Sequence, residues 1–304
     1  MQSLTLALDW TPNINHIGFF VAQAKGFYQA QDLELLILDP SSDNYAITPA
    51  KKVELGQADL ALCPTESLIS YHTKRSPFAL MGIASIFQED LSAIVVRADA
   101  GIESPKALDG KSYASYQARY EDAIVKQMIR HDGGEGNLDV AYPAKLGIWN
   151  TLVNGEFDAT WIFVNWEGVE AKGQGIDLKL FRMKDYGIPY SYSPVIAAGK
   201  SRITTQIELY RKFLSATKQG YLYCQANPQE AAEIIQPHVP ASDAKIDLIK
   251  ALEASIPALG NAETWGRMES SQIEAFLSWL RIHQLESSSL QVSNFIELNL
   301  MDQA

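Results

Sequence analysis

The chain contains little of what marks disulfide-rich or nucleic-acid-binding proteins. Only two of its 304 residues are cysteines, Cys63 and Cys224, and neither belongs to a C-x-x-C motif. This usage predicts two buried free thiols rather than a disulfide. The 25 Lys and Arg residues stand against 36 Asp and Glu residues, and charges of both signs are interspersed along the chain. A net charge of −11 argues against a nucleic-acid partner, which requires clustered basic side chains.

Long apolar runs are also absent. No window approaches the roughly eighteen consecutive apolar residues of a transmembrane helix, so we expect no insertion into a membrane. Residues 1–3 lead directly into the first expected strand, which indicates no signal peptide and predicts a cytoplasmic protein. If a leader had been removed from a longer chain, the protein would instead be periplasmic or lipid-anchored outside the cell.

The motifs of common enzyme classes are missing as well. Neither Gly-rich nucleotide-binding motif occurs, the five histidines lack H-E-x-x-H spacing, and there is no G-x-S-x-G nucleophile elbow. Cys63 ends an expected strand and is a candidate nucleophile, but it has no positioned histidine beside it. The residues therefore predict no catalytic group, no metal site and no cofactor.

What the sequence does contain is a regular alternation of strands and helices. Strands expected at 3–10, 33–40 and 58–64 alternate with helices expected at 16–31 and 47–57. This order predicts a mostly parallel sheet with right-handed crossovers. A second α/β series follows from residue 92, and its segment 150–164 repeats the pattern of 51–64. In both segments a helix ends at glycine and an aspartate opens the next strand, which indicates two domains of related topology.

We therefore predict an α/β fold with two lobes, each a mixed sheet flanked by helices. The first lobe combines residues 1–91 with 199–304, the inserted second lobe is residues 92–198, and two crossings lie near 92–97 and 193–198. Paired crossings form a hinge that closes around a ligand. Ligands in open α/β sheets bind beyond the carboxyl ends of strands, which points to the loops after residues 10, 63, 115 and 163.

These loops share aromatic, amide and acidic side chains. Aromatic faces stack on a flat heterocycle, and a carboxylate accepts hydrogen bonds from an exocyclic amine. Each feature also has a structural alternative: an aromatic packs in the core, His16 supports a helix start, an acid complements a helix dipole, and Arg119 pairs with Glu121 or Asp122. The co-occurrence at separate strand ends favours a binding site. The candidate ligand-binding residues are Trp10, Asn13, His16, Glu66, Ser67, Tyr116, Gln117, Arg119, Trp161, Trp166, Glu167 and Tyr190.

Residues 8–28, 56–67, 166–178 and 185–199 resemble the family that joins fungal thiamin-pyrimidine synthases to bacterial solute-binding proteins for thiamin-pyrimidine precursors. The resemblance implies the type-II periplasmic-binding-protein fold. It also implies, for the binding branch, a formylated or hydroxymethyl aminopyrimidine as ligand. Exported bacterial members of that branch pass the ligand to an ABC transporter, so a transporter permease is an expected partner if this chain is exported.

The synthase branch differs in its chemical residues. That branch consumes its own active-site histidine and a pyridoxal phosphate held on a lysine, with iron, and the two residues lie four apart after the third strand. Cys63 and Ser67 stand at these positions here. The phosphate-gripping turn of the synthases aligns with 117–120, where Arg119 could still hold a phosphate, and their cysteine-rich run aligns with the cysteine-free 189–194. The resemblance therefore favours binding without a cofactor over synthesis. Binding of an alkyl sulfonate is a weaker alternative, because such sites need more N–H donors and fewer aromatics.

Overall fold

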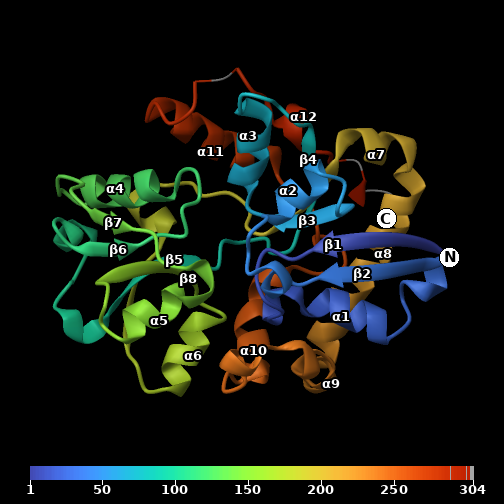
Figure 1. Ribbon diagram of the computed structural model, residues 1–304, viewed down its shortest axis with the longest axis horizontal. Coiled ribbons are helices and arrows are strands. Elements are labelled where there is room, and N and C mark those ends of the chain that lie inside the picture. Colours follow the sequence, from blue (N-terminus) through green and yellow to red (C-terminus); the bar gives the residue numbers. More distant parts are fainter. Residues whose placement is uncertain (288, 299, 302–304) are drawn as a thin grey trace.

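The computed structural model describes residues 1–287, 289–298 and 300–301. It contains two five-stranded sheets, which form the two lobes seen in Figure 1. The first sheet has the strand order β2 (Leu33–Leu38), β1 (Gln2–Ala7), β3 (Leu60–Cys63), β10 (Val195–Gly199), β4 (Leu80–Ser85). The second has the order β7 (Asp139–Ala141), β6 (Ser112–Ala114), β8 (Ala159–Phe163), β5 (Ser92–Arg97), β9 (Leu178–Phe181).

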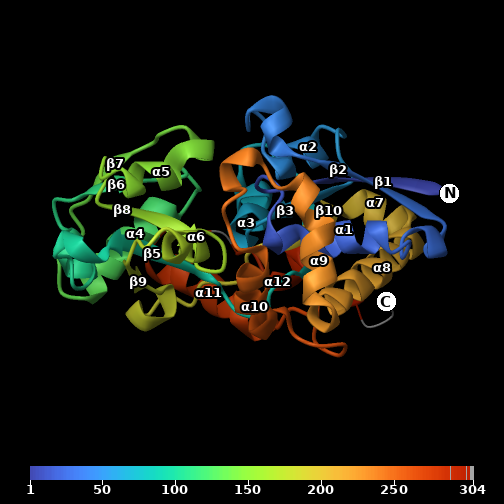
Figure 2. The ribbon, with the colours of Figure 1, turned by 90° about the horizontal axis from the view of Figure 1, so that it is seen from below.

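Helices flank both sheets. Those of the first lobe are α1 (Ile17–Ala24), α2 (Pro49–Glu54), α3 (Thr65–Thr73), α7 (Lys200–Thr205), α8 (Ile207–Ala226), α9 (Pro228–Ile235), α10 (Leu248–Leu259) and α12 (Val292–Phe295). Those of the second are α4 (Glu121–His131), α5 (Ile148–Val153) and α6 (Glu167–Gly173). Helix α11 (Ser270–Ile282) reaches toward the second lobe in Figures 1 and 2. The predicted α/β fold of two lobes with mixed sheets is confirmed.

The two sheets share one topology. In each, a single strand runs antiparallel to its neighbours: β10 against β3 and β4, and β5 against β8 and β9. That strand is also the one whose chain arrives from the other lobe. The remaining pairs with assigned register, β1 with β2 and β3, and β6 with β7 and β8, are parallel. The parallel strands of both lobes therefore end on the side where the lobes meet.

The repeat seen in the sequence is a structural repeat. Helix α2 leads into β3, and α5 leads into β8, through glycines with φ of 70° at Gly56 and 72° at Gly155. This left-handed backbone favours glycine. The carboxylate of Asp59 then accepts a backbone N–H of β1 at 2.8 Å, and that of Asp158 accepts a backbone N–H of β6 at 2.9 Å. Each aspartate thus ties the strand that follows it to a parallel neighbour, β3 to β1 and β8 to β6.

The first crossing between the lobes lies just before the segment predicted for it, and the second overlaps its predicted segment only at residues 193–194. Residues 86–91 connect β4 to β5, and residues 182–194 connect β9 to β10. The predicted end of the second lobe, residue 198, falls within β10. Because β10 forms backbone hydrogen bonds with β3 and β4, strand pairing places residues 195–198 in the first lobe.

Helices α1 and α8 pack closely and position the loop after β1. A Cβ atom at residue 220 would lie 2.1 Å from the carbonyl oxygen of Gly18, so the helices cross where only glycine fits. The neighbouring Tyr221 donates its O–H to the carbonyl oxygen of Asn15 at 2.7 Å. This bond fixes the polar loop between β1 and α1.

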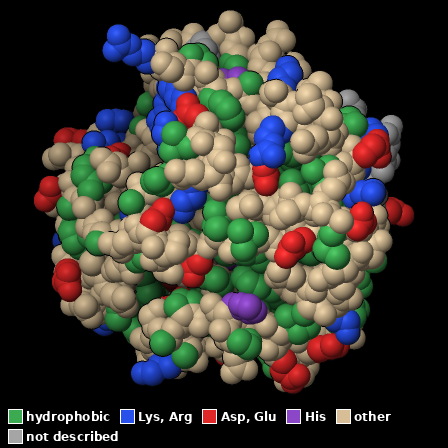
Figure 3. Space-filling model, turned by 45° about the vertical axis from the view of Figure 1, so that its right-hand side comes forward, with side chains coloured by type: hydrophobic (Ala, Val, Ile, Leu, Met, Phe, Trp, Pro, Cys, Tyr) green, Lys and Arg blue, Asp and Glu red, His purple; other side chains and the backbone are tan. Residues whose placement is uncertain are grey.

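The structure also describes the two cysteines, the surface charges and the length of the helices, on which the sequence analysis made predictions. Cys63 and Cys224 are buried free thiols, as predicted. On the face shown in Figure 3, acidic and basic side chains are interspersed. Within the described residues, no helix is both long and apolar enough to cross a lipid bilayer.

Candidate functional site

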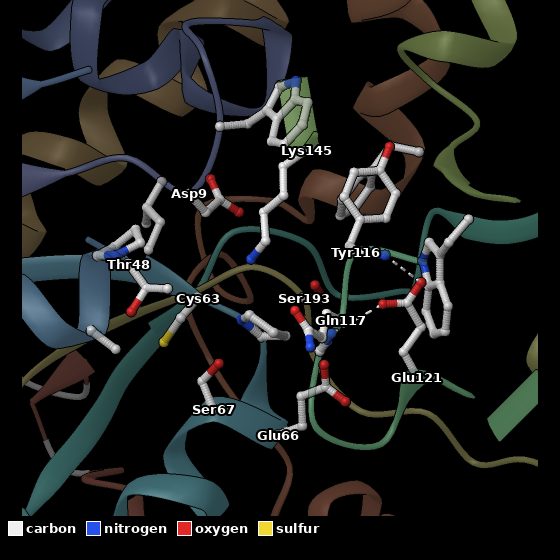
Figure 4. Close-up of a pocket in the computed structure, with 18 of the residues that line it drawn as sticks. Asp9, Thr48, Cys63, Glu66, Ser67, Tyr116, Gln117, Glu121, Lys145 and Ser193 are labelled. Atoms are coloured by element: carbon white, nitrogen blue, oxygen red, sulfur yellow. Dashed lines mark hydrogen bonds between the residues drawn. The ribbon is translucent and has the colours of Figure 1, made fainter. Parts of the chain in front are cut away.

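A cavity of about 350 Å³ lies where the strand ends of the two lobes face each other. Its walls come from the loops after β1, β2 and β3 in the first lobe, after β6, β7 and β8 in the second, and from the return crossing (Figure 4). All predicted site residues except His16 line it: Trp10, Asn13, Glu66, Ser67, Tyr116, Gln117, Arg119, Trp161, Trp166, Glu167 and Tyr190. That they contact a ligand stays a prediction.

The polar loop after β1 is held by bonds within itself. The Asn13 carboxamide oxygen accepts the Asn15 N–H at 2.8 Å, which caps the short 3-10 helix η1 (Ile14–His16). His16 accepts the Asn13 N–H at Nδ1 (3.2 Å), so its Nε2–H donates to Asp9 Oδ1 (2.8 Å). The His16 ring is fully buried and does not line the cavity. His16 therefore supports the loop, and the expectation that it orients the ligand directly is corrected.

Two aromatic clusters line the cavity. The Trp10 ring lies 5.9 Å from that of Tyr45 and 5.7 Å from that of Tyr116, the latter in an edge-to-face arrangement. Because Tyr116 belongs to the second lobe, this contact spans the cleft. The Trp161 ring lies 5.2 Å from that of Tyr190. Such clusters offer flat apolar faces to a planar ligand.

Two buried carboxyl groups also line the cavity. Glu66, in the first turn of α3, has an Oε2 atom with no hydrogen-bond partner among the described residues. Burial, aided by the nearby Glu121 charge, raises the pKa of Glu66 to about 8. Glu167, which begins α6, accepts the Phe163 N–H at 3.0 Å, and burial raises its pKa to about 7. At neutral pH the cavity therefore contains carboxyl groups able to donate hydrogen bonds as well as accept them.

Glu121 organises the loop after β6 and was not predicted as a site residue. Its carboxylate accepts the Tyr113 O–H (2.8 Å), the Tyr116 N–H (3.0 Å) and the Ala118 N–H (3.1 Å). Burial raises the pKa of Glu121, and these three donors oppose that shift. They hold Gln117, whose φ is 62°, in a left-handed conformation at the cavity wall.

Tyr45 and Lys145 are further lining residues that the sequence analysis missed. Tyr45 follows β2, and its O–H donates to the Asp9 carbonyl oxygen. Lys145 follows β7, and its ammonium points into the cavity (Figure 4), 5.0 Å from the centre of the Tyr45 ring. Burial lowers the pKa of Lys145. The strand-end rule applied to β2 and β7 would have found both residues.

Polar side chains of the second lobe form hydrogen bonds with the first lobe beside the cavity. Arg119 pairs with Glu286 at 2.9 Å, and not with Glu121 or Asp122 as in the structural alternative, and it also donates to Thr73. The Asn165 amide nitrogen donates to Asn15 Oδ1 at 2.7 Å and to Ser255 Oγ at 2.8 Å, all three residues being buried. The lobes are therefore closed on each other around the cavity.

Comparison of the sequence with known protein families gives one match that covers most of the chain. The family described as "NMT1/THI5 like" matches residues 13–231, more than half of the 304 residues. The chain belongs to the NMT1/THI5-like family. The resemblance drawn from the sequence is thereby confirmed.

The chain is also similar to binding proteins and to enzymes. The chain is 24% identical over 294 residues to the formylaminopyrimidine-binding protein of Halalkalibacterium halodurans, covering 93% of this chain and 86% of the relative. It is 24% identical over 251 residues to the 4-amino-5-hydroxymethyl-2-methylpyrimidine phosphate synthase THI12 of Saccharomyces cerevisiae, covering 76% and 69%.

Solved structures of low identity share the fold of this family member. The alkanesulfonate-binding protein SsuA from Xanthomonas axonopodis pv. citri superposes with a TM-score of 0.72 at 12% identity, covering 98% of this chain and 99% of that one. A Candida albicans protein, the CA3427 gene product with the generic periplasmic binding protein fold, gives 0.71 at 14% identity, covering 98% and 96%. These likenesses confirm the predicted periplasmic-binding-protein fold.

Proposed function

We propose that the protein binds a small aminopyrimidine of the thiamin pathway, such as formylaminopyrimidine, in the cavity between its lobes. Binding would serve uptake, salvage or sensing; for an exported chain, an ABC transporter permease would be the partner. The observation that carries this proposal is the interlobe cavity in which two aromatic clusters and two buried carboxyl groups meet. The formylaminopyrimidine-binding relative supports it.

The chemistry of the cavity suits such a ligand. Its volume of about 350 Å³ lies in the range of small-molecule sites, and half of its lining residues are aromatic or aliphatic. Each stacked aromatic contributes about 0.5–1.5 kcal/mol beyond the burial of its area. Glu66 and Glu167 supply polar groups for the edge of the ring, where an exocyclic amine needs acceptors.

Calorimetric titration with formylaminopyrimidine tests the proposal. We expect saturable heat with the wild-type protein and at least a tenfold loss of affinity in Trp10→Ala, because that ring joins both Tyr45 and Tyr116. Tyr142→Ala, which removes an exposed aromatic outside the cavity, should bind like the wild type. No heat and no thermal shift at millimolar ligand would overturn the proposal.

Synthesis of the pyrimidine is the second candidate, because the family includes synthases. The residues at the positions of the synthase lysine and histidine do not fit its cofactor, since Cys63 offers a thiol and Ser67 a hydroxyl. The cavity does contain one lysine amine among the described lining residues, that of Lys145 from the opposite lobe. A change in pyridoxal phosphate absorbance that Lys145→Met abolishes, or loss of mass at a histidine during turnover, would support this candidate.

A further inference from the structure

Glu66 differs from the other carboxyl groups that line the cavity. Asp9 accepts from His16, Glu121 accepts from three donors, and Glu167 accepts from a backbone N–H. Glu66 is only 5% exposed, and its Oε2 atom has no hydrogen-bond partner among the described residues. Native proteins rarely leave a buried polar atom unpaired, so this oxygen marks a place where a ligand atom belongs.

The surroundings of Glu66 oppose its ionisation. No ion pair of Glu66 occurs among the described residues, and the charge that acts on it is that of Glu121, which has the same sign. Burying an unpaired carboxylate is costly, and protonation removes the cost. The lysine ammonium in the cavity is itself partly desolvated. The titratable or charged groups that line the cavity with Glu66 are Asp9, Tyr45, Cys63, Tyr71, Tyr116, Arg119, Glu121, Lys145, Glu167 and Tyr190, and Tyr120 lies on the adjoining loop.

We propose that Glu66 acts as a neutral carboxylic acid that recognises an unprotonated ring nitrogen lying next to an amino group. Its O–H donates to the ring nitrogen while its carbonyl oxygen accepts from the amino group, so both acid oxygens are paired. The inference rests on the proposed function and narrows it. The ligand class is a neutral heterocycle with this donor–acceptor edge, as in a 4-aminopyrimidine, and a ring lacking either group is disfavoured.

An ionised Glu66 would select a ligand in a different protonation state. A carboxylate only accepts hydrogen bonds, so it would pair with a ring whose nitrogen carries the proton. The two cases differ in where one proton lies within the complex. They also differ in their response to substitution, because glutamine keeps one donor and one acceptor whereas leucine keeps neither.

Nitrogen NMR of the complex distinguishes these cases. With ring-¹⁵N-labelled formylaminopyrimidine bound to the wild-type protein at pH 7, we expect the chemical shift of the neutral ring, as recorded for the free ligand at alkaline pH. The shift of the protonated ring would overturn the inference. Absence of any binding would instead overturn the proposed function, so the two failures are separable.

Substitution at Glu66 provides the second measurement. Glu66→Gln should retain affinity within about threefold at pH 7, whereas Glu66→Leu should lose about 10- to 100-fold, the worth of two hydrogen bonds. Because the complex needs the acid form of Glu66, whose pKa in the closed ligand-free protein is raised to about 8, wild-type affinity should fall by up to about tenfold per pH unit above about pH 8. Glu66→Gln should show no such fall.

A buried acid outside the cavity serves as control. Asp90 has a pKa raised by burial to about 6 and does not line the cavity, so Asp90→Asn should keep the alkaline fall in affinity. Equal losses in Glu66→Gln and Glu66→Leu, with both variants folded by circular dichroism, would contradict the inference. So would an alkaline fall that persists unchanged in Glu66→Gln.

Discussion

Replacing Asn165 with alanine should weaken ligand binding although Asn165 does not line the cavity. Its amide nitrogen bridges the lobes by donating to Asn15 Oδ1 and to Ser255 Oγ. Both bonds exist only when the lobes are closed, because the donor lies in the second lobe and the acceptors lie in the first. In an open form, water would solvate all three groups. The variant therefore destabilises the closed form relative to the open one.

The size of the effect follows from these contacts. Two buried hydrogen bonds contribute about 1–3 kcal/mol together. Ser255 still donates to the Ala251 carbonyl oxygen at 2.7 Å in the variant, so the main loss is the donor to Asn15. If the ligand binds only the closed form, its apparent Kd rises by at most the factor that closure loses, about 5- to 150-fold, and by less where the ligand-free wild-type protein is already mostly closed.

Calorimetry measures the predicted loss of affinity, and small-angle scattering measures the predicted opening of the lobes. Asn165→Ala should bind formylaminopyrimidine more weakly and, without ligand, show a larger radius of gyration than the wild type. The matched control is Asn154→Ala, which replaces an exposed asparagine of the same lobe whose side chain bonds only Glu156 among the described residues, and it should change neither quantity. A folded Asn165→Ala protein with wild-type affinity and dimensions would refute the reasoning.

Other predictions concern packing and thiol chemistry. Gly220→Ala should lower the free energy of unfolding by about 2–3 kcal/mol, because its Cβ would meet the Gly18 carbonyl oxygen at 2.1 Å. Gly173→Ala, with nothing within 4 Å of the added carbon, should instead raise it by about 0.5–1 kcal/mol; urea unfolding compares the two variants. Cys63 and Cys224, whose thiol pKa values are raised by burial, should react with a thiol reagent only as fast as the native protein opens. Rapid labelling of both thiols in the native protein would contradict their burial.

The strand-end rule explains why so much of the site could be predicted. Both sheets have the same order and the same single antiparallel strand, so the parallel strands of the two lobes end at one cleft. Residues placed after a strand by sequence pattern alone therefore converge, as Trp10 and Tyr116 do from different lobes. The rule left out Tyr45 and Lys145 only because the loops after β2 and β7 were not considered.

Three other features of the structure could not be predicted correctly from sequence patterns. The partner of Arg119 is Glu286, 167 residues away, and no spacing pattern reveals such a pair. Strands β7 and β9 contain three and four residues, too short for a periodic pattern. For His16, the local sequence did contain a pattern, but that pattern indicates a structural role. The spacing Asn13-x-x-His16 matches a helix-capping box, which accounts for the burial of its ring.

Closure of the lobes and the protonation of Glu66 should be coupled, because residues of the second lobe create its environment. Burial raises the pKa of Glu66 and the Glu121 charge across the cleft adds to that shift, so opening that exposes Glu66 to water would return its pKa toward the ordinary value. In Asn165→Ala, which favours the open form, Glu66 should be ionised at pH 7 before the ligand binds. Binding and closure would then take up close to one proton per molecule, whereas the closed wild-type protein should take up close to none. Calorimetry in two buffers of different ionisation enthalpy measures this difference, and equal proton counts in a variant that scattering shows to be open would disprove the coupling.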